Sequence, residues 1–500
     1  MIRELKTLAL IALVGLAGCD DDDSDGNTGG EAGAGGMSGG AGGDVGGAGG
    51  EAGAGGSTLE LPIEVPETYA FQSRFQAGTS VVYTGQTGRH VLLDHLKGYI
   101  GDLTDETFTN PAEGDVVAAL NYFFDFKNAG GSEEIELQTA IGAPLAQSTF
   151  GDIGGIVSLA EKMAEVDAGF EGPAVGYGDG TMNPTEALND MFVGLEALVI
   201  ARFNGMIPQD PNGQDIAQVY VSADGVDYQQ LIQKYLLGAV AFSQGADDYL
   251  DDDLEGKGLL SDNTAPVEGK SYTGLEHVWD EGFGYFGAAQ DYGLYTDEEL
   301  AAKGGRDGWS GGYHDSNGDG VIDLGSEYNF GASANAAKRD LGATVATDFT
   351  QDAIDAFLMG RTLIVNADGA LTTEQLDELR MHRDVAVGAW EAAIAATAVH
   401  YVNDVLGDMD TFGTDDYSFA DHAKHWSELK GFALSLQFNP RSPIIQDPAV
   451  YARLHAVIGN APVLPNAGDE AIEAYRGALN EARAILGESY GFDMENVANW

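Results

Sequence analysis

The 500-residue sequence is poor in cysteine and in basic residues. Its single cysteine excludes an intrachain disulfide and a cysteine-built zinc site. Only 24 lysines and arginines stand against 80 aspartates and glutamates, which gives a formal net charge of −56. Nucleic-acid binding needs a basic face, so no nucleic-acid partner is expected. Hydrophobic residues still make up 44% of the chain, which is enough to bury a large core.

Long hydrophobic runs are also scarce, and the clearest one lies near the N-terminus. Arg3 and Lys6 precede an apolar stretch at 8–16, which is shorter than the roughly 20 residues of a membrane-spanning helix and is typical of a secretory signal. The stretch ends in Leu-Ala-Gly-Cys at 16–19, which resembles the lipobox of bacterial lipoproteins. The resemblance implies that residues 1–18 are a signal peptide and that a lipid on Cys19 anchors the protein to a membrane. An ordinary signal peptide with an incidental cysteine is the alternative.

The segment at 19–57 has no periodic apolar face. Residues 20–57 contain 17 glycines and eight acidic side chains, so we expect a disordered tether there. Signal and tether together predict an extracytoplasmic protein that is lipid-anchored to a bacterial membrane and faces the periplasm or the cell surface. The acidic excess fits either adaptation to salt or a surface that gathers cations.

Strand-like alternation is scarce, and residues 80–83 are the best candidate for a strand. Helical signals are frequent. Asn183-Pro184-Thr185-Glu186 combines an N-cap, a first-turn proline and a capping-box acid ahead of an apolar run to about residue 203. Further helices are predicted at 227–250, 372–406 with an interruption at Gly388, 418–438 and 469–486. We therefore predict an all-α fold of antiparallel helical bundles with long loops over residues 58–500, in two bundle-like halves.

The most specific motif is Asp-Ser-Asn-Gly-Asp-Gly-Val-Ile-Asp at 315–323. It resembles the calcium loop of EF-hands and dockerins, in which about six to eight oxygen atoms surround the ion. The ligands that this resemblance implies are Asp315, Asn317, Asp319, the carbonyl of Val321, Asp323 and Glu327. Glu327 departs from the pattern because it comes one residue late. We predict a structural calcium site at 315–327, between the two halves; a turn rich in Asp, Asn and Gly is the alternative.

Two short motifs place histidines beside acids on predicted helices. His277 and Glu281 share a helix face at i, i+4, and His422, His425 and Glu428 follow one another at three-residue spacing. Imidazole and carboxylate groups on facing helices form iron, zinc or manganese sites in helical bundles. These five residues are therefore a candidate site for iron or zinc. Histidines that pair locally with an acid are the alternative.

Three stretches together resemble the bacterial lipoprotein family catalogued as domain of unknown function 4856. They are Tyr-Thr-Gly-Gln-Thr-Gly-Arg-His at 83–90, Asp-Gly-Val-Ile-Asp-Leu-Gly-Ser-Glu-Tyr-Asn-Phe at 319–330 and His-Trp-Ser-Glu-Leu-Lys-Gly-Phe at 425–432. This resemblance implies no established activity. Gly-x-x-His-x-x-Asp at 274–280 is distantly similar to the Gly-x-His-x-x-Glu of imelysins, although it is one residue longer and ends in Asp. Imelysins are helical extracytoplasmic proteins linked to iron uptake, so that similarity implies paired helical bundles.

These features predict a membrane-anchored, calcium-stabilised lipoprotein that binds a metal such as iron, or another ligand, without catalysis. A second hypothesis is a surface scaffold that binds a protein or a polysaccharide, with calcium purely structural. A third is a metal-dependent hydrolase, which would need three protein ligands and an open coordination position. The sequence lacks His-Glu-x-x-His, and it does not identify a protein partner.

Overall fold

The computed structural model describes residues 59–127, 143–154 and 158–500, and over these ranges it is helical without a β-strand. The predicted all-α class is confirmed. The α-helices are α1 (Thr84–Gly101), α2 (Asp115–Phe124), α3 (Phe150–Ile153), α4 (Pro184–Phe203), α5 (Tyr228–Leu236), α6 (Gly274–Phe286), α7 (Asp297–Leu300), α8 (Gly331–Leu341), α9 (Phe349–Ala367), α10 (Thr373–Asp410), α11 (Phe419–Ser435), α12 (Pro448–Ile458), α13 (Asp469–Tyr490) and α14 (Met494–Asn499).

Helix starts follow the local capping signals. The Asn183 side chain accepts a hydrogen bond from the Glu186 backbone N–H, and the Glu186 carboxylate accepts one from the Asn183 backbone N–H, as in a capping box. Thr273 and Glu276 form the same pair at the start of α6. The helix α10 passes through Gly388 without a break, so the predicted interruption is wrong.

The candidate strand at 80–83 is a second correction. These residues form neither a strand nor a ladder; the nearest pairing is an isolated bridge between Gln72 and Thr79. The segment instead leads directly into α1, which begins at Thr84. No strand runs beside this short alternating segment, so its backbone does not form a sheet ladder.

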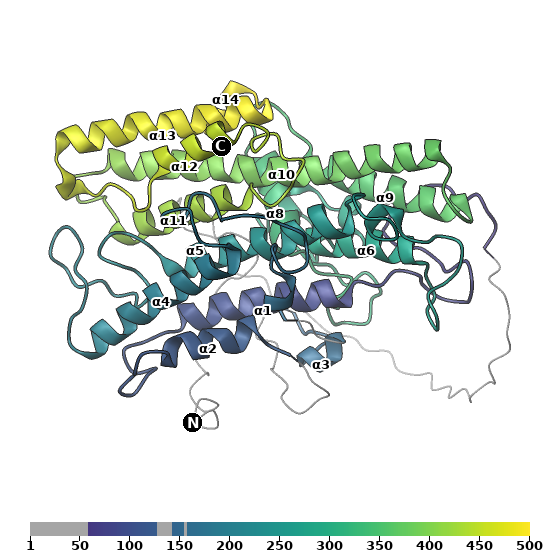
Figure 1. The fold of residues 1–500 in the computed structure, drawn as a ribbon, viewed down its shortest axis with the longest axis horizontal. Coiled ribbons are helices and arrows are strands. Elements are labelled where there is room, and N and C mark those ends of the chain that lie inside the picture. Colours follow the sequence, from purple (N-terminus) through teal and green to yellow (C-terminus); the bar gives the residue numbers. More distant parts are fainter. Residues whose placement is uncertain (1–58, 128–142, 155–157) are drawn as a thin grey trace, which may run out of the picture.

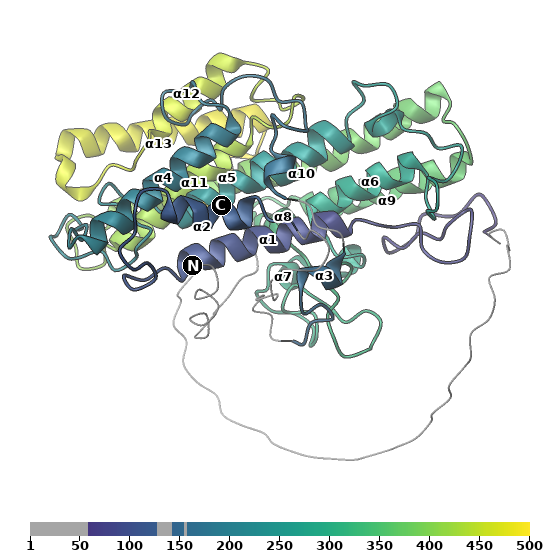
Figure 2. The same ribbon diagram turned by 60° about the horizontal axis from the view of Figure 1, so that its bottom comes forward.

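The long helix α10 lies at the centre of the arrangement. Figure 1 shows α9 and α11 beside it, with α12 and α13 along one side and α1, α2 and α4 on the other. Figure 2 shows the short helices α3 and α7 and the loops around them beneath α1 and α8. By length and composition α10 could cross a membrane, but 78% of its apolar window is buried inside the protein, as in a core helix.

One continuous hydrophobic core includes residues from Tyr69 to Trp500. Trp279, Trp390 and Trp426 are among its largest buried side chains. Within this core, α5 continues into two π-helical segments, η3 (Leu237–Phe242) and η4 (Gln244–Tyr249). A Cβ atom at Gly245 would lie 2.6 Å from the Trp390 ring, so only glycine allows this approach. Such π segments are frequent at functional sites.

Candidate functional site

The loop at 315–327 turns three polar side chains onto its own backbone. The Asp315 carboxylate accepts hydrogen bonds from the N–H groups of Gly318 at 2.7 Å and Gly320 at 2.8 Å. Asn317 Oδ1 accepts from the Asp319 N–H at 2.8 Å, and Asp319 Oδ1 accepts from the Val321 N–H at 3.0 Å. Both glycines have positive φ angles, which a side chain would disfavour. These local hydrogen bonds are compatible with the predicted calcium loop and with the alternative, a turn rich in Asp, Asn and Gly.

The two remaining acids of the loop are held by protein groups. Glu327 is buried, and its carboxylate accepts from the Ser316 N–H at 2.9 Å and from the Asp323 N–H at 2.9 Å, so it joins the two arms of the loop. Asp323 Oδ1 accepts from Gln147 Nε2 at 2.7 Å. The side chain of Ile322 is buried, and its backbone forms a bridge with Leu145. The oxygen donors at 315, 317 and 319 suit a hard cation such as calcium.

On α6, His277 and Glu281 form a local pair. His277 Nε2 lies 3.6 Å from Glu281 Oε2, and the imidazole stacks on Tyr272 with ring centroids 4.3 Å apart. Glu281 also accepts a hydrogen bond from Gln86 Nε2 of α1 at 2.9 Å. Burial lowers the pKa of His277 and raises that of Glu281.

On α11, each of the three candidate residues has a partner on another segment. His425 Nδ1 lies 2.9 Å from Asp408 Oδ2 of α10, and Glu428 Oε1 lies 3.3 Å from Lys234 Nζ of α5. Burial disfavours the charged His425 ring, but the hydrogen bond and charge of Asp408 outweigh it and raise its pKa to about 8. His422 contacts the Tyr417 hydroxyl at 3.2 Å.

The predicted iron or zinc ligands thus occupy two places with separate partners. The α6 pair faces α1, whereas the α11 residues face α10 and α5. Over 59–127, 143–154 and 158–500, no group of three or more histidines, cysteines, aspartates or glutamates is arranged to hold a metal ion. Cys19 lies outside the described residues.

Sequence reasoning missed a polar cluster around the α6 pair. We define the α1–α6 cluster as a group of side chains from α1, α6, η4 and the short helix η2 (Ala160–Lys162) that are joined by contacts or by their charges. It comprises Gln86, Arg89, Lys162, Asp248, Tyr249, His277, Glu281 and Tyr285. Arg89 Nη1 donates to the Tyr285 hydroxyl at 2.7 Å, and Lys162 Nζ donates to the Tyr249 hydroxyl at 3.2 Å. The two tyrosine rings lie 5.6 Å apart.

Burial, followed by the charge of Asp167, raises the pKa of Asp248 in this cluster to about 6. The available signals were the stretch at 83–90, which contributes Gln86 and Arg89, and the His277 motif itself. Nothing in the sequence links either stretch to η4, because a π-helical segment has no simple local pattern. Acids whose pKa is shifted, beside a buried cation, are a common feature of functional sites.

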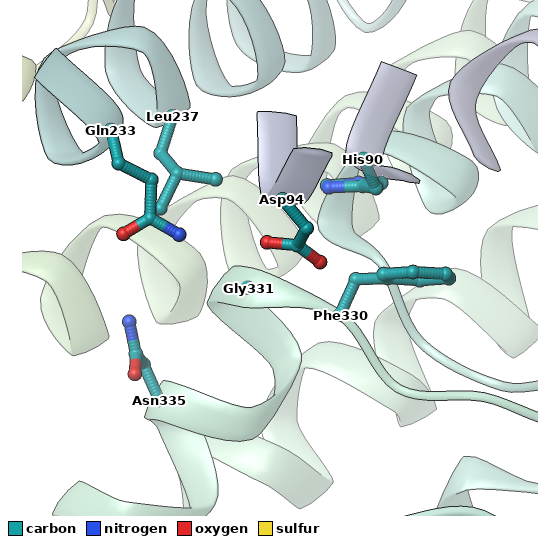
Figure 3. Close-up of a pocket in the computed structure, with 7 residues that line it drawn as sticks. All are labelled: His90, Asp94, Gln233, Leu237, Phe330, Gly331 and Asn335. Carbon is teal, nitrogen blue, oxygen red and sulfur yellow. The ribbon is translucent and has the colours of Figure 1, made fainter. Parts of the chain in front are cut away.

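Two small cavities lie beside His90 and Asn335, the first where α1, α5 and α8 meet and the second where α1, η3, α8, α10 and α11 meet. Figure 3 shows the first, whose lining is His90, Asp94, Gln233, Leu237, Phe330, Gly331 and Asn335. The cavities measure about 10 Å³ and 20 Å³, room for about one water molecule each. His90 Nε2 donates to the carbonyls of Gly284 and Tyr285 near the end of α6, and burial lowers the pKa of His90 to about 4. His90 is therefore neutral and fixes α1 against α6.

Comparison with known proteins bears on the segment that contains the α1–α6 cluster. Residues 66–294 match a family model described as domain of unknown function (DUF4856). This match over residues 66–294 supports membership of the DUF4856 family. No curated protein and no solved structure matches it. All eight members of the α1–α6 cluster lie within the DUF4856 match, whereas the loop at 315–327 and the helix α11 lie beyond its end.

Proposed function

We propose that this DUF4856 protein is an extracytoplasmic, lipid-anchored binding protein that is stabilised by calcium and is not an enzyme. The observation that carries the proposal is the loop at 315–327, where the side chains of Asp315, Asn317 and Asp319 turn inward around backbone N–H groups. Extracellular calcium modules bind their ion at about 10⁻⁴–10⁻³ M, concentrations that are met outside the cell.

The location rests on the N-terminal sequence. The basic residues Arg3 and Lys6, the apolar stretch and the lipobox-like ending at Cys19 support export and lipid attachment. The glycine-rich segment at 20–57 supports a spacer role between the membrane and the helical body. The paired-bundle arrangement and the distant relationship to imelysins stay predictions.

Calcium would act as a clip between segments far apart in the sequence. The loop is joined to 144–147 through the Ile322 backbone and the Asp323 side chain, and Glu327 closes it onto its own residue Ser316. An ion held by Asp315, Asn317 and Asp319 would neutralise acids that otherwise repel each other. The loop connects segments of the chain, and it does not line either of the two cavities beside His90. We therefore expect the calcium ion to have a structural role.

Two other roles remain as alternatives within the same proposal. Iron or zinc capture is favoured by the His425–Asp408 pair, because a metal-bound histidine commonly donates its other ring N–H to a carboxylate. A scaffold role, with a protein or polysaccharide partner, is favoured by the glycine-rich tether predicted at 20–57. Isothermal titration of the metal-stripped protein with calcium, ferrous and zinc ions separates the first alternative from calcium binding alone.

Calcium binding has a direct test in thermal melts. Saturating calcium should stabilise the protein by about 1–3 kcal/mol relative to excess chelator, and this should appear as a Tm rise of a few degrees. Asp319→Ala should abolish the difference. Asp179→Ala is a matched control, because Asp179 also caps an exposed turn, through the Thr181 N–H at 3.1 Å. Identical melts of the wild type with and without chelator would refute the calcium clip.

A further inference from the structure

The α1–α6 cluster contains a buried cation. Arg89 is 3% exposed, and its Nη1 donates to the Tyr285 hydroxyl. Its Nε is buried without a hydrogen-bond acceptor, and no carboxylate in the described part of the chain lies within ion-pair distance of the guanidinium. A buried charge is costly unless a counter-charge and hydrogen bonds compensate it. The Arg89 Nε–H is therefore a buried donor that an anionic acceptor could satisfy.

Acids lie in the same cluster. Glu281 is on α6 and Asp248 is on η4. Glu281 is oriented by Gln86, whose Nε2 donates to its Oε1 at 2.9 Å. The side chains of Glu281, Lys162 and His277 are 17%, 17% and 28% exposed, so this part of the cluster reaches solvent. A ligand that enters the cluster would meet anionic acceptors near solvent and the Arg89 cation beneath them.

A glycine on α6 allows α6 to approach α1 closely at the cluster. A Cβ atom at Gly284 would lie 2.6 Å from Tyr83 Cβ and 3.0 Å from Gln86 Cβ, so glycine alone permits this approach of α6 to α1. A Cβ atom at Gly85 would lie 3.6 Å from Arg89 Nη1, so the guanidinium lies along the first turn of α1. The N-terminal end of a helix also favours negative charge.

We propose that the α1–α6 cluster binds a small organic carboxylate that also carries an ammonium or hydroxyl group. The ligand carboxylate would pair with the Arg89 guanidinium, and its second polar group would donate to Glu281. A guanidinium presents donors in a planar fork that matches a carboxylate. The proposal rests on the binding role given above, but it does not depend on the calcium ion.

The test uses the full chain and measures Tm and then heat of binding with five probes. L-serine and lactate contain both polar groups, acetate lacks the second group, and ethanolamine and glycerol lack the carboxylate. Serine or lactate should raise the Tm in a concentration-dependent way. Acetate, ethanolamine and glycerol should bind at least about tenfold more weakly, because each leaves one side of the cluster unpaired.

Two variants and one control assign the binding to these residues. Glu281→Gln keeps the shape of its side chain and should weaken serine at least about tenfold while acetate is unchanged. Arg89→Met should abolish the response to every carboxylate. Arg202→Met removes a comparably buried arginine, paired with Asp105 outside the cluster, and should leave binding intact. The proposal fails if no probe raises the Tm, or if Glu281→Gln binds serine as the wild type does. Calcium titration of the same samples shows separately whether the calcium proposal holds.

Discussion

Replacing Arg361 by methionine should lower the free energy of unfolding by about 3–5 kcal/mol, because buried Asp280 would lose its cation and buried Glu276 would be left with Arg74. Arg361 on α9 is fully buried. Its Nε donates to Asp280 Oδ1 at 2.7 Å, its Nη1 to Glu276 Oε1 at 3.1 Å and its Nη2 to Ser80 Oγ at 2.8 Å. All three hydrogen bonds reach segments distant in the sequence, so the loss would loosen α9, α6 and the segment before α1 together.

The network offers a way to separate charge from packing. Burial raises the pKa of Asp280 to about 6 even though Arg361 opposes it, so this carboxylate is the most costly to leave uncompensated. The double variant Arg361→Met with Asp280→Asn should therefore recover part of the lost stability. Urea unfolding of both variants measures this.

Arg453→Met removes an arginine whose partner Glu481 is exposed, and it should leave the urea midpoint unchanged. A loss for Arg361→Met no larger than for this control would contradict the assigned role of the network. Recovery in the double variant would show that the unpaired charge, rather than a cavity, carries the cost.

Helices were predictable where their signals are local. The cap at Asn183 and the run to Phe203 correspond to α4 as found, because capping boxes act within one turn. Gly388 was a misleading signal. The cost of a glycine within a helix is about 1 kcal/mol, and the packing of its buried neighbours Val387 and Ala389 outweighs it. The π-helical segments had no local signal, since they depend on contacts such as that between Gly245 and Trp390.

The partners of site residues were beyond the reach of sequence spacing. The motif at 422–428 predicts which side chains share a helix, but the Lys234 that pairs with Glu428 comes almost 200 residues earlier. For the same reason, the role of Asp280 depends on Arg361 of another helix. A tight turn at 315–321 was predictable, because its hydrogen bonds join residues two to five positions apart; calcium binding there stays a prediction.

Lys430 should make stability depend on pH in an unusual direction. It is 2% exposed, and its Nζ donates to the Gly459 carbonyl at the end of α12 at 2.7 Å. Burial lowers the pKa of Lys430 from 10.5 to about 7. Between these values the unfolded chain binds the proton more tightly than the folded protein, so the Lys430 contribution destabilises at pH 7 and fades as the pH rises towards 10.5.

The wild-type penalty from this lysine should shrink by about 3 kcal/mol between pH 7 and pH 9.5. Lys430→Met keeps the aliphatic length without the charge, so the difference in unfolding free energy between variant and wild type should change by that amount over the interval. Denaturant unfolding at both pH values measures it. Taking the difference between variant and wild type cancels the titration of all other groups. The control is Lys257→Met, at an exposed lysine, whose difference from the wild type should be the same at both pH values. A pH-independent difference for Lys430→Met would mean that the ammonium group stays fully charged in the folded protein, with the Gly459 carbonyl and nearby solvent sufficient to compensate its burial.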